Sequence, residues 1–409
     1  MSERILGCRS CGLRELLPVL DLGRTPLANR LLTHAQLGDV EPTFPLVLVF
    51  CPACTLLQIT ETVSPEVLFA DYVYFSSFSD TMVAHAKRLA ESLVEEFSLG
   101  PSHQVIEAAS NDGYLLQHYR SLGVSVLGIE PAANVAKTAI EQRSIPTVVA
   151  FFGEATARRL VAEGYRADVF HAHNVLAHVA DLNDFVRGIH TILSEVGVAV
   201  LEVPYARSFI DHCEFDTVYH EHLCYFSLTA LDTLFRRHGL LIRRAEEVPI
   251  HGGSLRILAS RGSSSEDGVS KLLASERAAG LDRYDYYERF GSRVERLKGT
   301  LVDLLAALKA AGKTLAAYGA SAKGSTLLNY FRIGPELLDF VVDRSTCKQG
   351  LHTPGTRLRI EPPENLAARR PDYTLLLTWN FADEILIQQA AYRAAGGRFI
   401  VPIPQVKVL

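Results

Sequence analysis

The chain has 409 residues, of which 48% are hydrophobic and 21% charged, and its net charge is -5 at pH 7. This length predicts two or three globular domains with enough apolar side chains for several cores. The slight acidity and the lack of a long basic run argue against a nucleic-acid partner. No apolar run reaches the length of a membrane span and the N-terminus lacks a signal-peptide core, so we expect a cytoplasmic protein without membrane contact.

Four of the seven cysteines form two Cys-x-x-Cys pairs near the N-terminus, which are Cys8 with Cys11 and Cys51 with Cys54. A single pair of this kind can be a redox motif, but two pairs bring four thiolates to one ion and complete a tetrahedron. Four protein ligands leave no open coordination position. The spacing therefore predicts a structural Zn²⁺ site in an N-terminal domain of residues 1–66. An odd number of cysteines argues against a disulfide framework.

A second domain is predicted over residues 67–262. It opens with an aromatic, hydroxyl-rich segment that contains Tyr72 and Tyr74 and then continues as a helix. The front of this segment is either a packed aromatic cluster or a lid over a polar ligand. The helix is indicated by apolar residues at helical spacing, namely Met82, Ala86, Leu89, Leu93 and Phe97.

From residue 103 onward strands alternate with helices, which is the pattern of an α/β fold with a parallel sheet covered on both faces. Strands are expected at 104–110, 125–131, 147–152, 168–179 with its exit loop, 197–204, 239–250 and 252–261. Helices are expected at 111–123, 134–143, 182–195 and 227–239. The first of these helices is expected to be capped by Asn111 or Asp112 and to end at Gly123.

Ligands of such sheets bind at the carboxyl ends of the strands, where polar residues gather in this chain. Glu130 lies where a ribose-binding acid belongs, although capping or solvent exposure is the alternative for it and for Glu107. The first turn is not G-x-G-x-x-G, which disfavours NAD. A nucleoside with a positive charge held by carboxylates fits better, and S-adenosylmethionine is the candidate. The predicted cofactor residues are Glu107, Ser110, Asn111, Asp112, Gly113, Glu130 and Asn174.

Residues 214–226, EFDTVYHEHLCYF, follow neither the helical nor the strand period. They hold Tyr219, His220, Glu221 and His222, and aperiodic titratable segments of this kind are typically loops that carry chemistry. In a helical turn Tyr219 and His222 would share a face, whereas an extended segment would put Tyr219 beside Glu221. The segment is either an active-site loop or an ordinary surface loop.

Residues 263–409 predict a charged helical connection followed by a second, smaller α/β domain. The turn that contains Ser321 and Lys323 resembles a phosphate cradle made of backbone N–H groups, a helix N-terminus and a lysine. It lacks the Walker spacing, and the alternative is a tight strand–helix connection. The elements are expected at 314–331 (strand, turn and helix), 339–345, 371–380, 381–396 (one helix) and 397–404.

Several segments together resemble one family, the C-methyltransferases that act on nucleotide-linked 4-keto-deoxysugars in antibiotic sugar pathways. The combination is specific, although no single segment would suffice, and it covers almost the whole chain in the family's order. One departure is Ala108-Ala109, where many relatives have glycine and where a methyl group could narrow the approach of the cofactor. The matching segments are C-R-S-C-G, D-L-G-R-T-P-L-A-N, F-C-P-A-C-T-L-L-Q, F-A-D-Y-V-Y-F-S-S-F-S, S-N-D-G-Y-L-L, H-N-V-L-A-H-V, E-F-D-T-V-Y-H-E-H-L-C-Y-F-S, H-G-G-S-L-R and A-Y-G-A-S-A-K-G.

The resemblance implies an N-terminal zinc-binding domain, a central Rossmann-like methyltransferase domain that uses S-adenosylmethionine, and a C-terminal Rossmann-like domain that helps to hold the nucleotide. It carries the zinc ligands to the four cysteines named above. The residues implied in catalysis are His222, Tyr219, Glu221, His178 and the lid tyrosine Tyr74. The residues assigned to the dTDP-4-keto-deoxysugar substrate are Ser321, Lys323 and Tyr72.

The implied chemistry agrees with these residue types. A ketone at C4 acidifies the hydrogen at C3, a base removes it, and the enolate carbon attacks the sulfonium methyl. His222 is the predicted base because imidazole titrates near neutrality. Tyr219 or Tyr74 would donate to the enolate oxygen, with His178 as a second donor. Glu221 would orient an imidazole or hold a sugar hydroxyl or amine.

Three alternatives stay open from the sequence. They are an O- or N-methyltransferase that uses S-adenosylmethionine, a nucleotide-sugar oxidoreductase or isomerase, and a non-catalytic nucleotide-sugar-binding protein. The missing glycine fingerprint counts against the oxidoreductase, and the density of acid/base groups in residues 214–226 counts against the binding protein. A monomer is compatible with the sequence.

Overall fold

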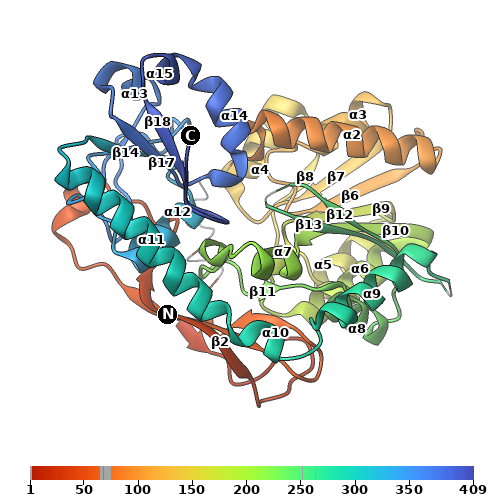
Figure 1. Ribbon diagram of the computed structural model, residues 1–409. Helices are drawn as coiled ribbons and strands as arrows, with labels where there is room; N and C mark the ends of the chain where they lie inside the picture. The colour runs from red at the N-terminus through yellow and green to blue at the C-terminus, as the bar shows by residue number, and fades with distance from the viewer. Residues whose placement is uncertain (1, 65–67, 69–74, 251, 263) are drawn as a thin grey trace.

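The computed structural model describes residues 2–64, 68, 75–250, 252–262 and 264–409 (Figure 1). The N-terminal region is built on an antiparallel sheet with the order β11-β4-β3-β2, beside which β1 and β5 form a separate pair. The strand β11 comes from the predicted second domain, so that domain completes the sheet of the first. The elements are β1 (Ser2–Arg4), β2 (Leu17–Pro26), η1 (His34–Gly38), β3 (Thr43–Phe50), β4 (Leu57–Ile59), β5 (Glu61–Val63) and β11 (Cys224–Tyr225).

The central domain contains a seven-stranded sheet with the order β12-β13-β10-β9-β6-β7-β8. Its pairs are parallel except those of β13, which runs antiparallel to both β10 and β12. The predicted parallel sheet thus contains one antiparallel strand, because β12 and β13 are joined without a helix and a short connection returns the chain antiparallel. The strands are β6 (Gln104–Ala108), β7 (Ser125–Ile129), β8 (Thr147–Val148), β9 (Ala167–His173), β10 (Leu193–Pro204), β12 (Leu241–Val248) and β13 (Ser254–Ser260).

Helices cover both faces of this sheet, as predicted (Figure 1). α2 buries the predicted apolar stripe against one face, whereas α5, α6 and α8 pack against the other. The sequence did not predict α5 and α7, which are short and bury few side chains. The helical elements are η2 (Ser76–Phe78), α2 (Asp80–Glu96), α3 (Leu116–Ser121), α4 (Ala133–Arg143), α5 (Glu154–Ala162), η3 (Leu176–His178), α6 (Leu182–Ile192), α7 (Ala206–Asp211), η4 (Phe215–Thr217) and α8 (Leu228–Arg237).

The C-terminal domain has a six-stranded sheet with the order β16-β15-β14-β17-β18-β19, parallel except for β19. The single helix expected at 381–396 is wrong, because Gln389 leaves the helical backbone region and divides it into α14 and α15. The elements are β14 (Leu315–Tyr318), α12 (Ala322–Phe331), β15 (Val341–Val342), β16 (Ile360–Glu361), α13 (Glu364–Arg369), β17 (Tyr373–Leu376), η5 (Trp379–Phe381), α14 (Ala382–Gln388), α15 (Ala390–Ala394), β18 (Arg398–Val401) and β19 (Lys407–Val408).

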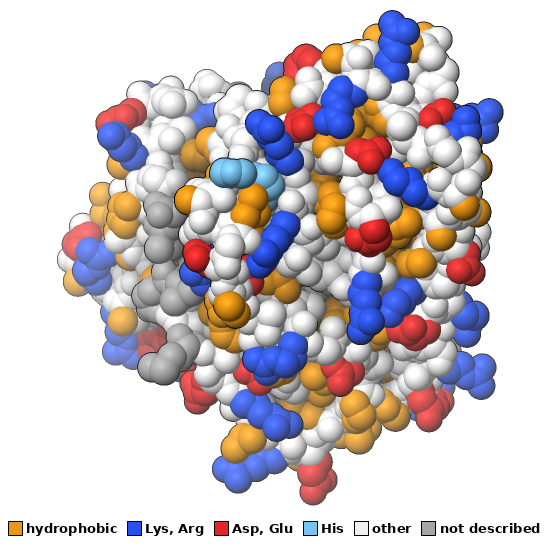
Figure 2. All heavy atoms as spheres, turned by 90° about the vertical axis from the view of Figure 1, so that its left-hand side faces the viewer, with side chains coloured by type: hydrophobic (Ala, Val, Ile, Leu, Met, Phe, Trp, Pro, Cys, Tyr) orange, Lys and Arg blue, Asp and Glu red, His pale blue; other side chains and the backbone are white. Residues whose placement is uncertain are grey.

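The predicted helical connection consists of α9 (Asp267–Ala279), α10 (Asp285–Glu288) and α11 (Phe290–Ala310). In Figure 1 the long α11 runs from the C-terminal domain down to β2, and its buried residues join one apolar core that includes side chains of all three domains. Within the described residues no helix is both long and apolar enough to cross a membrane. Charged side chains of both signs are interspersed on the face shown in Figure 2.

Candidate active site

The four predicted zinc ligands lie together in the N-terminal domain. Their Sγ atoms all lie within 4.8 Å of one another, with Cys8 and Cys54 3.4 Å apart and Cys11 and Cys51 3.5 Å apart. Sulfur atoms about 2.3 Å from a tetrahedral Zn²⁺ are separated by roughly 3.8 Å, so the donor set fits this ion. All four are free thiols. The predicted Cys₄ site is confirmed, and saturation by four thiolates makes it structural.

The first zinc knuckle, residues 8–11, is held from two sides. The N–H of Arg9 donates to Oε1 of Gln58 at 2.8 Å, and Nε2 of Gln58 donates to the carbonyl of Gly7 at 3.1 Å. On the other side, Nδ2 of Asn183 donates to the carbonyls of Arg9 and Ser10 at 3.2 and 3.1 Å. The knuckle is thereby fixed both to β4 of its own domain and to α6 of the central domain.

The turn after β6 is irregular, and the prediction that Asn111 or Asp112 caps a helix there is wrong. α3 begins only at Leu116, and its N-cap has no side-chain hydrogen bond. Ala109 and Asn111 adopt left-handed backbone conformations with φ of 49° and 50°, which are costly for residues other than glycine. Because the chain does not enter a helix directly, the polar side chains of the turn are available for other contacts.

The side chains of Asn111 and Asp112 accept hydrogen bonds from the hydroxyl-rich segment that precedes α2. The N–H of Ser76 donates to Oδ1 of Asn111 at 2.9 Å, and the Ser77 hydroxyl donates to Oδ2 of Asp112 at 2.5 Å. Tyr72 and Tyr74 lie outside the described residues, so their predicted roles stay predictions. The neighbouring serines do lie over the predicted cofactor turn, where a lid would begin.

Three carboxyl groups gather at this turn. Burial, and then the negative charges of Glu130 and Asp112, raise the pKa of Glu107 well above its ordinary value. Glu130 accepts the N–H groups of Asn111 and Ala132, both at 2.9 Å, and burial raises its pKa to about 6. The backbone-capping alternative for Glu130 is thus realised in part. A buried group of acids that repel one another is an environment that a positively charged ligand stabilises.

Three buried polar atoms at this turn are available for a ligand. Among the described residues, Oε2 of Glu107, Oγ of Ser110 and Oδ1 of Asp112 are buried without a hydrogen-bond partner. Gly113 adopts a φ of 78° at the end of the turn. Asn174 lies half-buried after the neighbouring strand β9, also with a left-handed backbone. The predicted cofactor residues therefore meet at the carboxyl ends of three adjacent strands, and the acids and unpartnered acceptors suit the sulfonium and ammonium charges of S-adenosylmethionine.

Residues 214–226 are largely buried and irregular, which excludes the surface-loop alternative. The N–H of His222 donates to the carbonyl of Tyr219 at 2.9 Å, so the two residues share a helical turn, one of the two predicted arrangements. Nδ1 of His222 lies 3.1 Å from the carbonyl of Thr217, which can only accept a hydrogen bond. Nδ1 therefore carries the proton, and Nε2 accepts the Tyr219 hydroxyl at 2.7 Å.

His178 joins this pair from the end of η3. Its ring meets the His222 ring edge to face, with centroids 4.7 Å apart. Desolvation by burial lowers the pKa of His178 to about 4, which keeps the imidazole neutral at physiological pH. The N–H of Leu223 donates to the carbonyl of Ala177 at 2.7 Å and fixes the two segments side by side. Three of the predicted catalytic residues are therefore in one cluster.

The side chain of Glu221 binds a residue that the sequence analysis did not select. Nδ2 of Asn29, from the turn after β2, donates to Oε1 of Glu221 at 2.8 Å. Burial raises the pKa of Glu221 to about 7, although Asn29 and the positive charge of Lys348 act in the opposite direction. The available signal was the segment P-L-A-N within the resemblance, which places Asn29 in a matching motif without indicating its partner.

The turn of the C-terminal domain is a regular helix start. Oγ of Ser321 accepts the N–H of Gly324 at 3.0 Å and caps α12, which agrees with the tight-connection alternative. The ammonium of Lys323 lies 4.8 Å from the ring centroid of Trp379, whose Nε1 donates to Oδ2 of Asp216 at 2.7 Å. The predicted substrate turn is thus tied to residues 214–226, which places it beside the candidate catalytic cluster.

Comparison with known proteins decides the family. Three family models match consecutive regions of the chain, a zinc binding domain over residues 8–69, a methyltransferase domain over 82–244 and a C-methyltransferase C-terminal domain over 249–404. The chain is 36% identical over 405 residues to the C-methyltransferase NovU of Streptomyces niveus, covering 98% of this chain and 96% of that protein. This chain belongs to the C-methyltransferase family. It is an S-adenosylmethionine-dependent enzyme with a Cys₄ zinc-binding domain.

Two solved methyltransferase structures each match less than half of this C-methyltransferase. Magnesium protoporphyrin IX methyltransferase from Synechocystis, with bound S-adenosylhomocysteine, is 14% identical with a TM-score of 0.36, covering 48% of this chain and 92% of that one. A SAM-dependent methyltransferase from Anabaena variabilis is 12% identical with a TM-score of 0.35, covering 42% and 84%.

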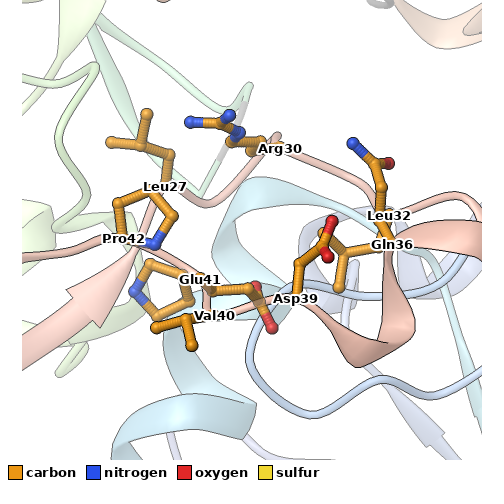
Figure 3. A pocket seen from close by; sticks show the side chains of 9 residues that line it. Leu27, Arg30, Leu32, Gln36, Asp39, Val40, Glu41 and Pro42 are labelled. Atoms are coloured by element: carbon orange, nitrogen blue, oxygen red, sulfur yellow. The ribbon is translucent and has the colours of Figure 1, made fainter.

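A separate cavity of about 100 Å³ lies in the zinc-binding domain of this C-methyltransferase. Figure 3 shows its lining side chains, which come from the turn after β2 and from the segment around η1. None of the predicted site residues lines it. The lining residues are Pro26, Leu27, Arg30, Leu32, Gln36, Asp39, Val40, Glu41 and Pro42.

Proposed function

We propose that this C-methyltransferase transfers the methyl group of S-adenosylmethionine to C3 of a dTDP-linked 4-keto-deoxysugar. The observation that carries the proposal is the hydrogen-bonded pair of Tyr219 and His222, a phenol and an imidazole held at 2.7 Å. Removing a proton from carbon beside a ketone requires both a base and a donor to the ketone oxygen. The substrate class is supported by the motif resemblance described above.

His222 is the proposed base. Nε2 takes the C3 proton, and the electron pair of the C3–H bond becomes the enolate. C3 then bonds to the methyl carbon as the sulfur–methyl bond breaks, and S-adenosylhomocysteine leaves. General-base catalysis of this kind contributes about 10²–10⁴-fold to the rate.

Tyr219 is the proposed donor to the substrate oxygen. Its hydroxyl occupies Nε2 of His222 in the structure, so the base becomes available when the phenol turns away. Turning toward the substrate would free the base and supply a hydrogen bond to the enolate oxygen in one movement. His178, kept neutral by its lowered pKa, would serve as a second donor, and Tyr74 would act from the lid. Glu221 would hold a hydroxyl or amine of the sugar.

The remaining assignments belong to the same proposal. Ser321 and Lys323 would bind the nucleotide from the C-terminal domain, together with Tyr72. The proposed domains are 1–66, 67–262 and 263–409. The residues that would bind S-adenosylmethionine are Glu107, Ser110, Asn111, Asp112, Gly113, Glu130 and Asn174.

The deciding experiment is a methyl-transfer assay with methyl-¹³C-labelled S-adenosylmethionine and a dTDP-4-keto-6-deoxysugar in deuterium oxide. We expect the sugar to gain one methyl group, with the labelled carbon bonded to C3 by NMR. In the presence of S-adenosylhomocysteine we expect deuterium to enter C3 without methylation, and we expect a His222→Gln variant to lose this exchange. A label bonded to oxygen or nitrogen, or transfer to none of the 4-ketosugars tried, would reject the proposal.

A further inference from the structure

Residues 217–225, which include His222, are held largely by other segments of the chain. Their only strand, β11, has two residues, Cys224 and Tyr225, which is too short to form stable structure alone. β11 pairs antiparallel with β4 of the zinc-binding domain, with Cys224 opposite Gln58. The N–H of Ile59 in β4 also donates to the carbonyl of Leu223 at 3.0 Å. The residue that directly follows His222 is therefore bonded to the zinc-binding domain.

Two further side chains of this segment contact the same domain. Nε2 of His220 donates to the carbonyl of Pro45 in β3 at 3.1 Å, and its ring lies edge to face on Phe44 with centroids 5.7 Å apart. Glu221 binds Asn29, as described above. The residues on both sides of His222 are thus seated on β3, β4 and the turn after β2.

Gln58 connects these contacts with the zinc-binding domain to the zinc site itself. Its side chain is fully buried and binds both sides of Cys8, through the carbonyl of Gly7 and the N–H of Arg9. Its backbone belongs to β4, where it faces Cys224. β4 also begins just after the second zinc knuckle, residues 51–54. The N–H of Cys51 donates to the carbonyl of Leu56, the residue before β4, at 2.9 Å.

We propose that the zinc site positions His222, with Gln58 as the positioning residue between the first knuckle and the β4–β11 pair. This inference rests on the role of His222 proposed above. Zinc binding supplies folding free energy to the residues around it, so the metal keeps β4 in place and β4 keeps β11 in place. A displacement of about 1 Å at a catalytic group can lower the rate about 10²-fold. The zinc-binding domain is a scaffold for chemistry in the neighbouring domain.

The test is a Gln58→Leu variant of the full chain, with Thr62→Val as the matched control. Thr62 binds the same knuckle by accepting a bond from the Arg9 guanidinium at 2.7 Å, but it lies in β5, which does not pair with β11. With zinc saturated, we expect Gln58→Leu to lower kcat about 10- to 100-fold, the range for residues that orient a functional group. The affinity for S-adenosylmethionine should stay within about twofold, because its predicted site lies on other strands.

Hydrogen exchange supplies a readout that needs no turnover. We expect the amides of residues 217–225 to exchange faster in Gln58→Leu and in the wild-type chain after zinc is chelated, and we expect added Zn²⁺ to restore the chelated protein. Unchanged exchange in both, or a kcat no lower than that of Thr62→Val, would overturn the proposal. If Gln58→Leu does not fold, Gln58→Glu keeps the acceptor for Arg9 and removes the donor to Gly7, and the same comparisons apply. A wild-type chain that exchanges as expected but methylates no 4-ketosugar would instead reject the proposed function.

Discussion

Glu202 and Glu221 are both buried glutamates of the methyltransferase domain, yet their pKa values are displaced in opposite directions. Burial would raise the pKa of Glu202, but His173, His85 and Arg256 outweigh it and hold that pKa well below its ordinary value. The contacts are short, with Nε of Arg256 at 2.6 Å, Nε2 of His85 at 3.0 Å and Nδ1 of His173 at 3.3 Å. These three partners stabilise the ionised form of Glu202.

Glu221 has much weaker compensation. Its one identified side-chain hydrogen bond comes from the neutral amide of Asn29, and burial raises its pKa to about 7. A group poised near neutrality can change its charge when a ligand arrives, whereas a compensated one cannot do so cheaply. The two glutamates thus differ in their partners, and we expect Glu202 to stabilise the fold and Glu221 to be available for chemistry.

The largest expected effect is on stability, from Glu202→Gln. Removing the negative charge leaves the guanidinium of Arg256 without its buried partner, and we expect a loss of about 3–5 kcal/mol in the free energy of unfolding at pH 7. Because the folded pKa of Glu202 is depressed, its stabilisation is present above its ordinary pKa of 4.5 and is lost as pH falls below it. Urea unfolding at pH 7 and at pH 4 should therefore show a smaller difference between variant and wild type at the lower pH.

Glu246→Gln is the matched control for this prediction. Glu246 binds the same Arg256 at 3.0 Å, but its side chain is 46% exposed. A solvent-exposed pair contributes at most about 1 kcal/mol. Equal losses from the two substitutions would show that the compensation of Glu202 is not what stabilises this region.

The second effect is on the reaction, from His222→Gln. We expect kcat to fall about 10³-fold, within the usual range for a general base, while the free energy of unfolding changes by about 1 kcal/mol, because one or two hydrogen bonds are altered. Initial rates of methyl transfer measure the change in kcat, and urea unfolding measures the change in stability. Turnover equal to that of the wild type would remove His222 from the mechanism.

The third effect is again on the free energy of unfolding, with the opposite sign to that of Glu202→Gln. Glu221→Gln replaces a buried carboxyl whose folded pKa is raised, so the carboxyl lowers stability progressively as pH rises from its ordinary pKa of 4.5 to about 7, and the loss is complete above that. We expect the variant to be more stable than the wild type by up to about 3 kcal/mol at pH 8 and nearly equal at pH 5. Unfolding curves at these two pH values test it, and a variant that is less stable at pH 8 would contradict the raised pKa.

The sequence predicted those parts of the site that depend on short-range spacing. Two Cys-x-x-Cys pairs can place four thiolates on one ion because each pair closes its own turn, and the Sγ atoms meet as expected. Tyr219 and His222 are three residues apart, so a single turn brings them together. The inner strands β6, β7, β9 and β10 were predicted because their short apolar runs are typical of strands that are buried on both faces, and most of their residues are buried.

Contacts between distant segments were not predictable in this way. Nothing in residues 214–226 indicates that β11 joins the zinc-domain sheet, because two residues are too few for a strand pattern. Asn111 and Asp112 have the residue types of a helix cap, but the incoming Ser76 and Ser77 take up their side chains. The antiparallel direction of β13 is an exception. It was foreseeable from the sequence, because residues 249–253 are too few for a helical crossover.

The smallest expected effect concerns the contact farthest from prediction, between Asn29 and Glu221, which are 192 residues apart. Asn29→Leu removes a donor that favours the ionised carboxyl, so the pKa of Glu221 should rise further. If activity requires ionised Glu221, the acid limb of the pH profile of kcat/KM moves to higher pH, and the loss at neutral pH corresponds to about 1 kcal/mol. Arg30→Leu, at the exposed neighbouring position, is the control and should leave the limb in place. A limb that stays fixed in Asn29→Leu would mean that Glu221 does not titrate in the reaction, and its difference from Glu202 would then concern stability alone.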